Sequence, residues 1–320
     1  MEKKDLRIVF MGTPEFAVET LKALVENGYN VVAVVTQPDK PVGRHGSVLQ
    51  PSQVKQYAVE HDLPVLQPEK MKDPAFVEEL RGYEADLQVV VAFRMLPEVV
   101  WAMPRFGTFN VHAALLPKYR GAAPINWAVI NGETQTGVTT FFLDHDIDTG
   151  RIIMQRPFDI PDDADVEYVY DGLMFLGAEI ALDTINQIIA GNGHVESTAQ
   201  SDFDTPPSLS GMVGEGFPLA PKIFKETCEI NWRQTAKQVY DFVRGLSPYP
   251  GAWTPFDDKT LKVYKTSKTT RPATGEAGTR VYEKGHMYVN CTDLQLEILE
   301  LQLSGKKRMA AREFLNGVRS

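Results

Sequence analysis

The chain of 320 residues is 43% hydrophobic and 23% charged, which is typical of a soluble globular protein and excludes a largely disordered chain. Its net charge is -9, but residues 1–206 carry 16 basic and 30 acidic side chains, whereas residues 207–320 carry 17 and 12. This asymmetry predicts a basic C-terminal part that faces an anionic partner, with a chance imbalance on a small domain as the alternative.

Neither the N-terminal residues nor the cysteines suggest an unusual environment. The first five residues are charged and lead directly into a strand-like segment, and no apolar run is expected to span a membrane, so we expect a cytoplasmic protein without a membrane anchor. The two cysteines, Cys228 and Cys291, lie far apart and lack metal-ligand spacing. We therefore expect two unpaired structural thiols, no disulfide and no metal site.

Short apolar segments alternate with helical patterns through the first half of the chain. Between the first two of them, apolar residues at helical spacing predict a helix with Thr13 as its cap and Pro14 at its first position. The run Val89-Val90-Val91 lacks polar alternation, as expected of a central parallel strand that is covered on both faces. The order of elements predicts a doubly wound α/β fold with a mostly parallel sheet. Strands are expected at 7–11, 31–36, 65–66, 87–92, 107–111 and 137–143.

A change of composition divides the second half of the chain. A long helix is predicted over 166–190, and the stretch 194–216 is rich in Ser, Thr, Asp, Pro and Gly, which predicts a linker on the surface. We place the boundary near Thr205-Pro206-Pro207, so the expected domains are 1–206, with a linker from about 191, and 207–320. In the second domain the patterns predict a helix and then short strands, which indicates a small, mostly β domain. The helix is expected at 235–246 and the strands at 261–265, 287–291 and 296–301.

Three polar residues stand near the ends of two predicted strands. Asn110 and His112 are two residues apart, so their side chains point to one face. Asp148 follows the next strand, and a carboxylate near an imidazole favours the charged imidazole. Because open α/β sheets bind ligands beyond the carboxyl ends of strands, we expect the three groups to meet there, where they can stabilise an oxyanion and move protons. A satisfied polar pair for Asn110 and His112, and a turn cap for Asp148, stay open as alternatives.

The residues around these three carry a resemblance to a known family. Asn-x-His at 110–112, Leu-Leu-Pro-x-x-Arg-Gly at 115–121 and Asp-x-Gly at 148–150 match the signature of the folate-dependent formyltransferases. The likeness begins at 8–16 and reaches Ser247-Pro248-Tyr249-Pro250, so it covers nearly the whole chain. The chain resembles this family, and within it the branch that acts on methionyl-tRNA.

The resemblance implies a fold and an activity. The fold is a Rossmann-like catalytic domain followed by an OB-like barrel that binds tRNA. The activity is transfer of the formyl group of 10-formyltetrahydrofolate to the α-amino group of initiator methionyl-tRNA, which releases tetrahydrofolate. We expect Asn110, His112 and Asp148 to be catalytic, no metal to take part, and the protein to act as a monomer. The dinucleotide pattern G-x-G-x-x-G is absent from the first turn, so NAD or FAD has little support.

The resemblance also implies contacts with both substrates. Phe16 is expected to meet the methionyl side chain, and Arg44, in a Pro/Gly-rich inserted loop at 38–46, to enter the acceptor stem of the tRNA. The basic cluster Lys306, Lys307 and Arg308 is expected to contact phosphates. The residues expected to line the folate are Arg94, Met95, Leu96, Leu115, Pro117, Asp144, His145, Asp146 and Ile147.

Two other functions remain open from the sequence. The first is formyl transfer to a small amine, such as a glycinamide ribonucleotide or an amino sugar; neither the Arg44 loop nor a basic C-terminal domain would then be needed. The second is a non-catalytic tRNA-binding protein with a decayed transferase domain. The intact Asn110, His112 and Asp148 argue against it.

Overall fold

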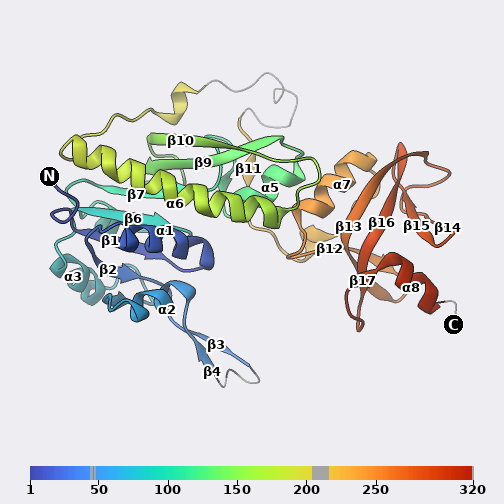
Figure 1. The fold of residues 1–320 in the computed structure, drawn as a ribbon, viewed down its shortest axis with the longest axis horizontal. Helices are drawn as coiled ribbons and strands as arrows, with labels where there is room; N and C mark the ends of the chain where they lie inside the picture. Colours follow the sequence, from blue (N-terminus) through green and yellow to red (C-terminus); the bar gives the residue numbers. More distant parts are fainter. Residues whose placement is uncertain (44–45, 47, 204–215, 319–320) are drawn as a thin grey trace. The chain divides into compact units, whose positions relative to one another are not determined.

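The computed structural model describes residues 1–43, 46, 48–203 and 216–318, which form two compact units (Figure 1). The second unit contains 121–136 and 159–170 together with the C-terminal residues from 219 onward, and the first contains the rest. The expected boundary near residue 206 lies outside the described residues. Two segments that were expected in the N-terminal domain therefore cluster with the C-terminal half of the chain.

The first unit is built on a seven-stranded sheet in the order β10-β9-β7-β6-β1-β2-β5. The five strands from β7 to β5 are parallel to their neighbours, and β9 is antiparallel to β7. The predicted α/β fold with a mostly parallel sheet is confirmed, and each predicted strand lies within two residues of its expected position. The strands are β1 (Ile8–Gly12), β2 (Val31–Val35), β5 (Val65–Leu66), β6 (Leu87–Val91), β7 (Thr108–His112), β9 (Gln135–Phe142) and β10 (Ile152–Asp159).

Helices cover both faces of this sheet. Apolar side chains of α3 and α4 pack with those of β1, β2 and β6 in one core cluster. On the other face α6 comes close to β7, since a Cβ built on Gly177 would lie 3.3 Å from Val111 Cγ1. Val111 thus faces α6, and its neighbours Asn110 and His112 face the side of α4. The helices are α1 (Glu15–Glu26), α2 (Gln53–Glu60), α3 (Pro74–Gly82), α4 (Glu98–Trp101) and α6 (Val166–Ala190).

The start of α1 differs from the prediction. Its N-cap is Pro14, with extended dihedrals and no side-chain cap hydrogen bond, so Thr13 does not cap the helix. Thr13 Oγ1 is instead buried without a hydrogen-bond partner among the described residues. The proline fixes the backbone angle φ for helix entry, and this needs no capping side chain.

The predicted long helix is confirmed as α6, and it corrects the expectation that no segment could span a membrane. Among the described residues it alone is long and apolar enough to do so by length and composition. Half of its most apolar window is buried inside the structure, and core helices of soluble proteins meet the same criterion. Buried residues such as Leu173, Ile180 and Ile185 account for its apolar character.

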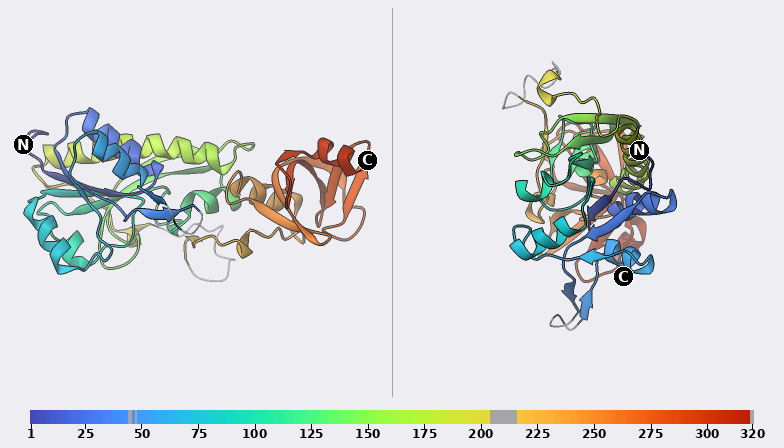
Figure 2. Two further views of the ribbon diagram at one scale, coloured as in Figure 1. Left: turned by 90° about the horizontal axis from the view of Figure 1, so that it is seen from below. Right: turned by 90° about the vertical axis from the view of Figure 1, so that its left-hand side faces the viewer.

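The inserted segment after β2 forms a hairpin where a loop was expected. Strands β3 (Lys40–Val42) and β4 (Val48–Gln50) pair antiparallel and are exposed along their length. The hairpin projects from the body of the first unit in Figures 1 and 2. Arg44 lies outside the described residues.

The stretch that was expected to be a surface linker is partly docked on the sheet. Thr198 and Ile152 exchange two backbone hydrogen bonds of 2.8 Å, and Phe203 packs against Leu116, Phe141 and Ile152. Between these anchors a short 3-10 helix, η2 (Gln200–Asp202), begins with a glutamine that is only 5% exposed. Composition alone did not predict this docking, because the anchors are backbone atoms and one phenylalanine.

The second unit holds an antiparallel β domain with helices beside it. Its sheet has the order β12-β13-β16-β15-β14, and β17 pairs with β16. The strands curve around a common interior in Figure 2, and the predicted C-terminal β domain is confirmed. Its elements are α5 (Pro124–Ile130), η4 (Glu226–Cys228), α7 (Ala236–Gly245), β12 (Ala252–Phe256), β13 (Lys259–Pro272), β14 (Arg280–Glu283), β15 (His286–Asn290), β16 (Leu294–Leu303), β17 (Met309–Ala310) and α8 (Ala311–Val318).

The helix α7 begins where the sequence predicted. Thr235 and Gln238 form a reciprocal capping box, in which each side chain bonds the other's backbone N–H. The opposite end of α7 packs on α5, because a Cβ on Gly245 would lie 2.6 Å from Ile130 Cγ1. Two short strands that precede α5 and α7 in the sequence, β8 (Arg120–Gly121) and β11 (Leu219–Ala220), pair with each other in a two-stranded sheet.

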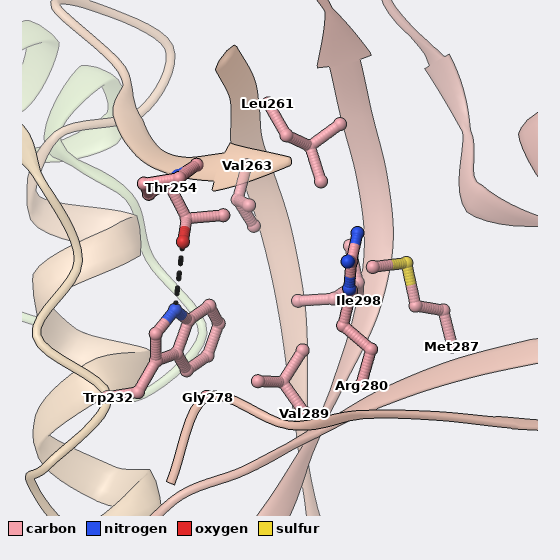
Figure 3. A pocket seen from close by; sticks show the side chains of 10 residues that line it. Trp232, Thr254, Leu261, Val263, Gly278, Arg280, Met287, Val289 and Ile298 are labelled. Carbon is pink, nitrogen blue, oxygen red and sulfur yellow. Dashed lines mark hydrogen bonds between the residues drawn. The ribbon is translucent and has the colours of Figure 1, made fainter. Parts of the chain in front are cut away.

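A small pocket of about 100 Å³ opens in the β domain (Figure 3). The Trp232 indole donates to Thr254 Oγ1 at 3.0 Å on one wall, and the guanidinium of Arg280, which stacks over Phe256, lies at another. The rest of the lining is mostly aliphatic, from residues such as Leu261.

Candidate active site

His112 is the last residue of β7 and its ring is held in one orientation. The residue is 6% exposed, and Nε2 lies 2.9 Å from the carbonyl oxygen of Tyr119. A carbonyl can only accept, so Nε2 carries a hydrogen and donates it. The ring also meets Phe141 edge-on, at 6.3 Å between centroids. The only ring nitrogen left for chemistry is therefore Nδ1.

Asp148 reaches this nitrogen by an unexpected route. Because β9 is antiparallel to β7, its last residue Phe142 pairs with Phe109, at the end of β7 that is far from His112. The sequence predicted that Asp148 follows the carboxyl end of a strand at the same edge of the sheet as His112. The carboxyl end of β9 instead lies at the opposite edge. The segment between β9 and β10 folds back and places Asp148 Oδ2 3.9 Å from His112 Nδ1. This distance is too long for a hydrogen bond, and the contact is an ion pair only when the imidazole is protonated.

The turn that carries Asp148 is closely constrained. Asp148 has a φ of 56°, in the left-handed region. Two residues later, a Cβ on Gly150 would lie 1.6 Å from the carbonyl oxygen of Phe142, so only glycine fits there. The Asp-x-Gly pattern is thereby explained by the backbone: the glycine allows the close approach, and this approach sets the position of the aspartate.

Asn110 supplies an unpaired polar group on the same face of β7 as His112. Its Oδ1 is buried and has no hydrogen-bond partner among the described residues. A buried acceptor without a donor costs about 1–3 kcal/mol, which a bound N–H or O–H group would recover. The arrangement offers an amide and an imidazole nitrogen to a reactant, with a carboxylate behind the imidazole.

The residues expected to line the folate fall into two groups. In the segment after β6, Met95 is 66% exposed and Leu96 is buried, while Arg94 is turned toward the backbone: Nη1 donates to Glu69 O at 2.8 Å and Nη2 to Pro68 O. Burial lowers the pKa of Arg94 from its usual value. Arg94 is thus engaged within the unit, and Met95 is the residue of this group that is open to a ligand.

The second group lies in the segment between β9 and β10. Asp144 accepts hydrogen bonds from the Asp146 N–H at 3.2 Å and from Thr149 Oγ1 at 2.7 Å, and so closes the turn. Ile147 is 58% exposed, and His145 lies edge-on to Trp101. These contacts give the segment a defined shape with an exposed apolar residue.

Leu115 and Pro117 precede the Arg-Gly of the signature. A Cβ on Gly137 would lie 2.5 Å from Leu115 Cδ2, so a glycine of β9 makes room for this leucine. Pro117 is buried and follows a cis peptide bond. In the sequence, both residues lie between His112, the last residue of β7, and Tyr119, whose carbonyl accepts from the His112 ring.

The residues expected to meet tRNA are placed less uniformly. Phe16 is 6% exposed, and its ring lies near Gly177 of α6, so it is a buried residue of the first unit. In the second unit Lys306, Lys307 and Arg308 are exposed, but the guanidinium of Arg308 makes two hydrogen bonds to Glu300, at 2.6 and 2.9 Å. This pairing raises the pKa of Arg308. Lys306 and Lys307 are thus the cations of this cluster that form no ion pair among the described residues.

The sequence did not point to every group at the site. Tyr119 acts through its carbonyl, which no side-chain pattern reveals, and Gln200 donates to the carbonyls of Asp148 and Gly150 from a stretch that composition marks as a linker. Beside the first turn the structure also has a cavity of about 350 Å³, lined by residues of 13–14, 37–42 and 50–53. The β3–β4 hairpin forms one of its walls.

Comparison with known proteins assigns the chain to a family. The family model "Formyl transferase" matches residues 6–185, and "Formyl transferase, C-terminal domain" matches residues 222–319. The chain is 58% identical to a methionyl-tRNA formyltransferase of Parabacteroides distasonis, over 99% of this chain and 97% of that protein. It is 55% identical to one of Bacteroides thetaiotaomicron, over 100% and 98%.

Solved structures share the fold at lower identity. The sugar 3N-formyl transferase WlaRD, crystallised with dTDP and 5-N-formyl-THF, matches with a TM-score of 0.65 and 17% identity over 94% of this chain and 99% of that one. HypX from Aquifex aeolicus, in complex with tetrahydrofolic acid, matches with a TM-score of 0.62 and 18% identity over 97% of this chain and 47% of its own, so the chain spans about half of HypX. With both family models and relatives of full length in agreement, the chain belongs to the formyl transferase family.

Proposed function

We propose that this protein transfers the formyl group of 10-formyltetrahydrofolate to the α-amino group of initiator methionyl-tRNA. Relatives of that name match it over nearly their whole length, which supports the choice of acceptor. The observation that carries the chemistry is the contact of His112 Nδ1 with Asp148, on the strand face that also bears the unpaired Asn110 Oδ1. The reaction belongs in the cytoplasm, where charged tRNA is used, and we expect a monomer to perform it.

The Asn110 amide is suited to position the attacking amine. Its buried Oδ1 can accept an N–H of the neutral α-amino group, while Nδ2 donates to the formyl oxygen. Attack places a negative charge on that oxygen, and a preorganised donor aimed at developing charge contributes about 3 kcal/mol to the lowering of the barrier. The same side chain thus holds the nucleophile and stabilises the oxyanion.

His112 acts through Nδ1, because Nε2 is occupied by Tyr119. A charged imidazole can donate from Nδ1 to the oxyanion, with Asp148 close enough to stabilise its charge. When the tetrahedral species collapses, the bond between the formyl carbon and N10 of the folate breaks. The proton lost by the amine then reaches N10, and His112 with Asp148 is the relay that we assign to this transfer.

Each substrate is assigned a separate part of the chain. The exposed Met95 and Ile147, with the other residues expected around the pterin, are proposed to contact the folate. The 350 Å³ cavity beside the first turn, with Lys40 and three glutamines in its lining, suits the end of the acceptor strand. The two free lysines of the basic cluster are proposed to contact tRNA phosphates, and Arg44 to contact the acceptor stem.

An amino-sugar acceptor is the competing function, favoured by the likeness of fold to WlaRD. The test is transfer of labelled formyl from 10-formyltetrahydrofolate to charged methionyl-tRNA, to a dTDP-linked amino sugar and to glycinamide ribonucleotide under the same conditions. We expect formyl-methionyl-tRNA as the product, with little transfer to the small amines. Preferred transfer to a small amine would replace this proposal, and no transfer to any acceptor would leave a binding role.

A further inference from the structure

We propose that Gln200 is a positioning residue that sets the separation of His112 and Asp148, an inference that rests on the proposed formyl transfer. Its side-chain amide joins the two segments that hold these groups. Nε2 donates to the carbonyl oxygens of Asp148 at 2.8 Å and Gly150 at 2.9 Å, and Oε1 accepts from Arg120 Nε at 3.0 Å and Nη2 at 2.7 Å.

The Arg120 side of this bridge leads directly to the histidine. Arg120 follows Tyr119, whose carbonyl oxygen accepts the hydrogen of His112 Nε2. Tyr119 has a φ of 60°, so its peptide groups are held in a left-handed turn. By fixing the Arg120 side chain, Gln200 restrains the turn that orients the imidazole.

The opposite side of the bridge leads to the aspartate. Asp148 also has a left-handed φ, and it lies in the segment between β9 and β10 rather than in a strand. The two hydrogen bonds from Gln200 fix the peptide carbonyls on both sides of Thr149. A strained turn persists only where its surroundings determine it. The Gln200 amide supplies two of the hydrogen bonds that do so here, in addition to those that Asp144 accepts from Asp146 and Thr149.

The chemistry of the position requires an amide. A glutamine offers two N–H donors and two acceptor lone pairs, and Gln200 uses all four while only 5% exposed. A glutamate would keep the contact with Arg120 but would place an oxygen against two carbonyl oxygens. An aliphatic side chain would leave both partners unsatisfied. The anchors at Thr198 and Phe203 hold this residue in place from either side.

The experiment compares Gln200→Glu with Gln295→Glu in the full chain. Gln295 is a matched control in the β domain: it is fully buried, its Oε1 accepts from Arg271 at 2.9 Å, and its Nε2 donates to Asn290 at 3.1 Å and Thr274 at 3.2 Å. Both variants should lose thermal stability. Only Gln200→Glu should lower kcat, by roughly 10- to 100-fold, with both KM values changed by less than about 3-fold.

A double-mutant cycle separates positioning from general damage. If Gln200 acts through Asp148, adding Gln200→Glu to Asp148→Asn should slow single-turnover formyl transfer by less than about 3-fold beyond Asp148→Asn alone. Losses that multiply would show that Gln200 acts elsewhere and would overturn the proposal, as would a normal kcat in folded Gln200→Glu. Wild-type protein that forms no formyl-methionyl-tRNA would instead contradict the proposed function.

Discussion

His112 illustrates how a backbone group decides the chemistry of a side chain. Donation from Nε2 to the Tyr119 carbonyl leaves Nδ1 as the reactive nitrogen and points it toward Asp148. Neither neighbour is evident from the spacing of the signature residues. The pattern Asn-x-His states only that two side chains share a face of a strand.

Loss of either polar group on this face should affect turnover more than binding. Both are proposed to stabilise charge that exists mainly in the transition state, so His112→Ala and Asn110→Ala should each lower kcat roughly 100-fold or more with smaller changes in KM. The control is His61→Ala, since the His61 ring also faces a backbone carbonyl, at 2.9 Å, but is exposed. Steady-state kinetics measure the effect. A folded His112→Ala protein with near-normal kcat would reject the assigned role.

The two cysteines should be inert in the native protein. Burial raises the pKa of Cys291 to about 12 and also raises that of Cys228. The thiolate is the reactive form, so at pH 8 neither residue should react with a thiol reagent until the β domain unfolds. Labelling with and without denaturant, followed by mass spectrometry, tests this. Rapid stoichiometric modification of the folded protein would show that the thiols are accessible.

At the scale of elements, strands were predictable where apolar residues are consecutive. β1 and β6 are short, mostly apolar strands buried at every residue, and α7 begins at a capping box. The direction of β9 could not be read, because pairing partners are not encoded in one strand's pattern. The predicted route of the chain to Asp148 was therefore wrong, although the proximity of Asp148 to His112 was expected. Helices α2 and α3 and the β3–β4 hairpin were not specified by the sequence patterns either.

Gly150 should be indispensable to the turn that carries Asp148. A methyl group there would meet a backbone oxygen at 1.6 Å, and backbone cannot yield as a flexible side chain can, so Gly150→Ala must displace the turn. A shift of about 1 Å in a catalytic group costs on the order of 100-fold in rate. We expect kcat to fall by that order and the melting temperature to decrease.

Gly82→Ala provides the comparison for this substitution. Gly82 is the last residue of α3, and a Cβ there would meet no atom within 4 Å. Alanine has the higher helix propensity, so this change should leave activity unaltered and raise stability by up to about 1 kcal/mol. Equal kinetics for the Gly150→Ala and Gly82→Ala proteins would contradict the proposed constraint on Asp148.

For the whole molecule, the uneven charge is the property that most directly concerns the proposed partner. An acidic chain can bind RNA if its cations are concentrated where the nucleic acid lies. The structure shows which cations of the cluster are available to bind phosphate. Arg308 is not one of them, because its guanidinium is hydrogen-bonded to Glu300 and stacks over the Tyr264 ring at 4.2 Å. The sequence showed three adjacent basic residues but could not show that a glutamate eight positions away neutralises one of them.

We therefore expect the lysines and the arginine of the basic cluster to differ in how strongly their substitution changes the salt dependence of tRNA binding. Each phosphate contact that is lost removes about 0.9 from the slope of log K against log salt, if the acceptor arm behaves roughly like a duplex. Lys306→Ala with Lys307→Ala should flatten the slope by up to about 1.8 and leave folate binding intact, whereas Arg308→Ala should change it by less than about 0.9. Lys72→Ala, at an exposed lysine of the first unit, is the control and should leave the slope unchanged. Filter binding of methionyl-tRNA at several salt concentrations gives these slopes.

An unchanged slope in the double variant would show that tRNA does not contact the turn between β16 and β17. A change of slope confined to Arg308→Ala would mean that RNA displaces Glu300 from the Arg308 guanidinium.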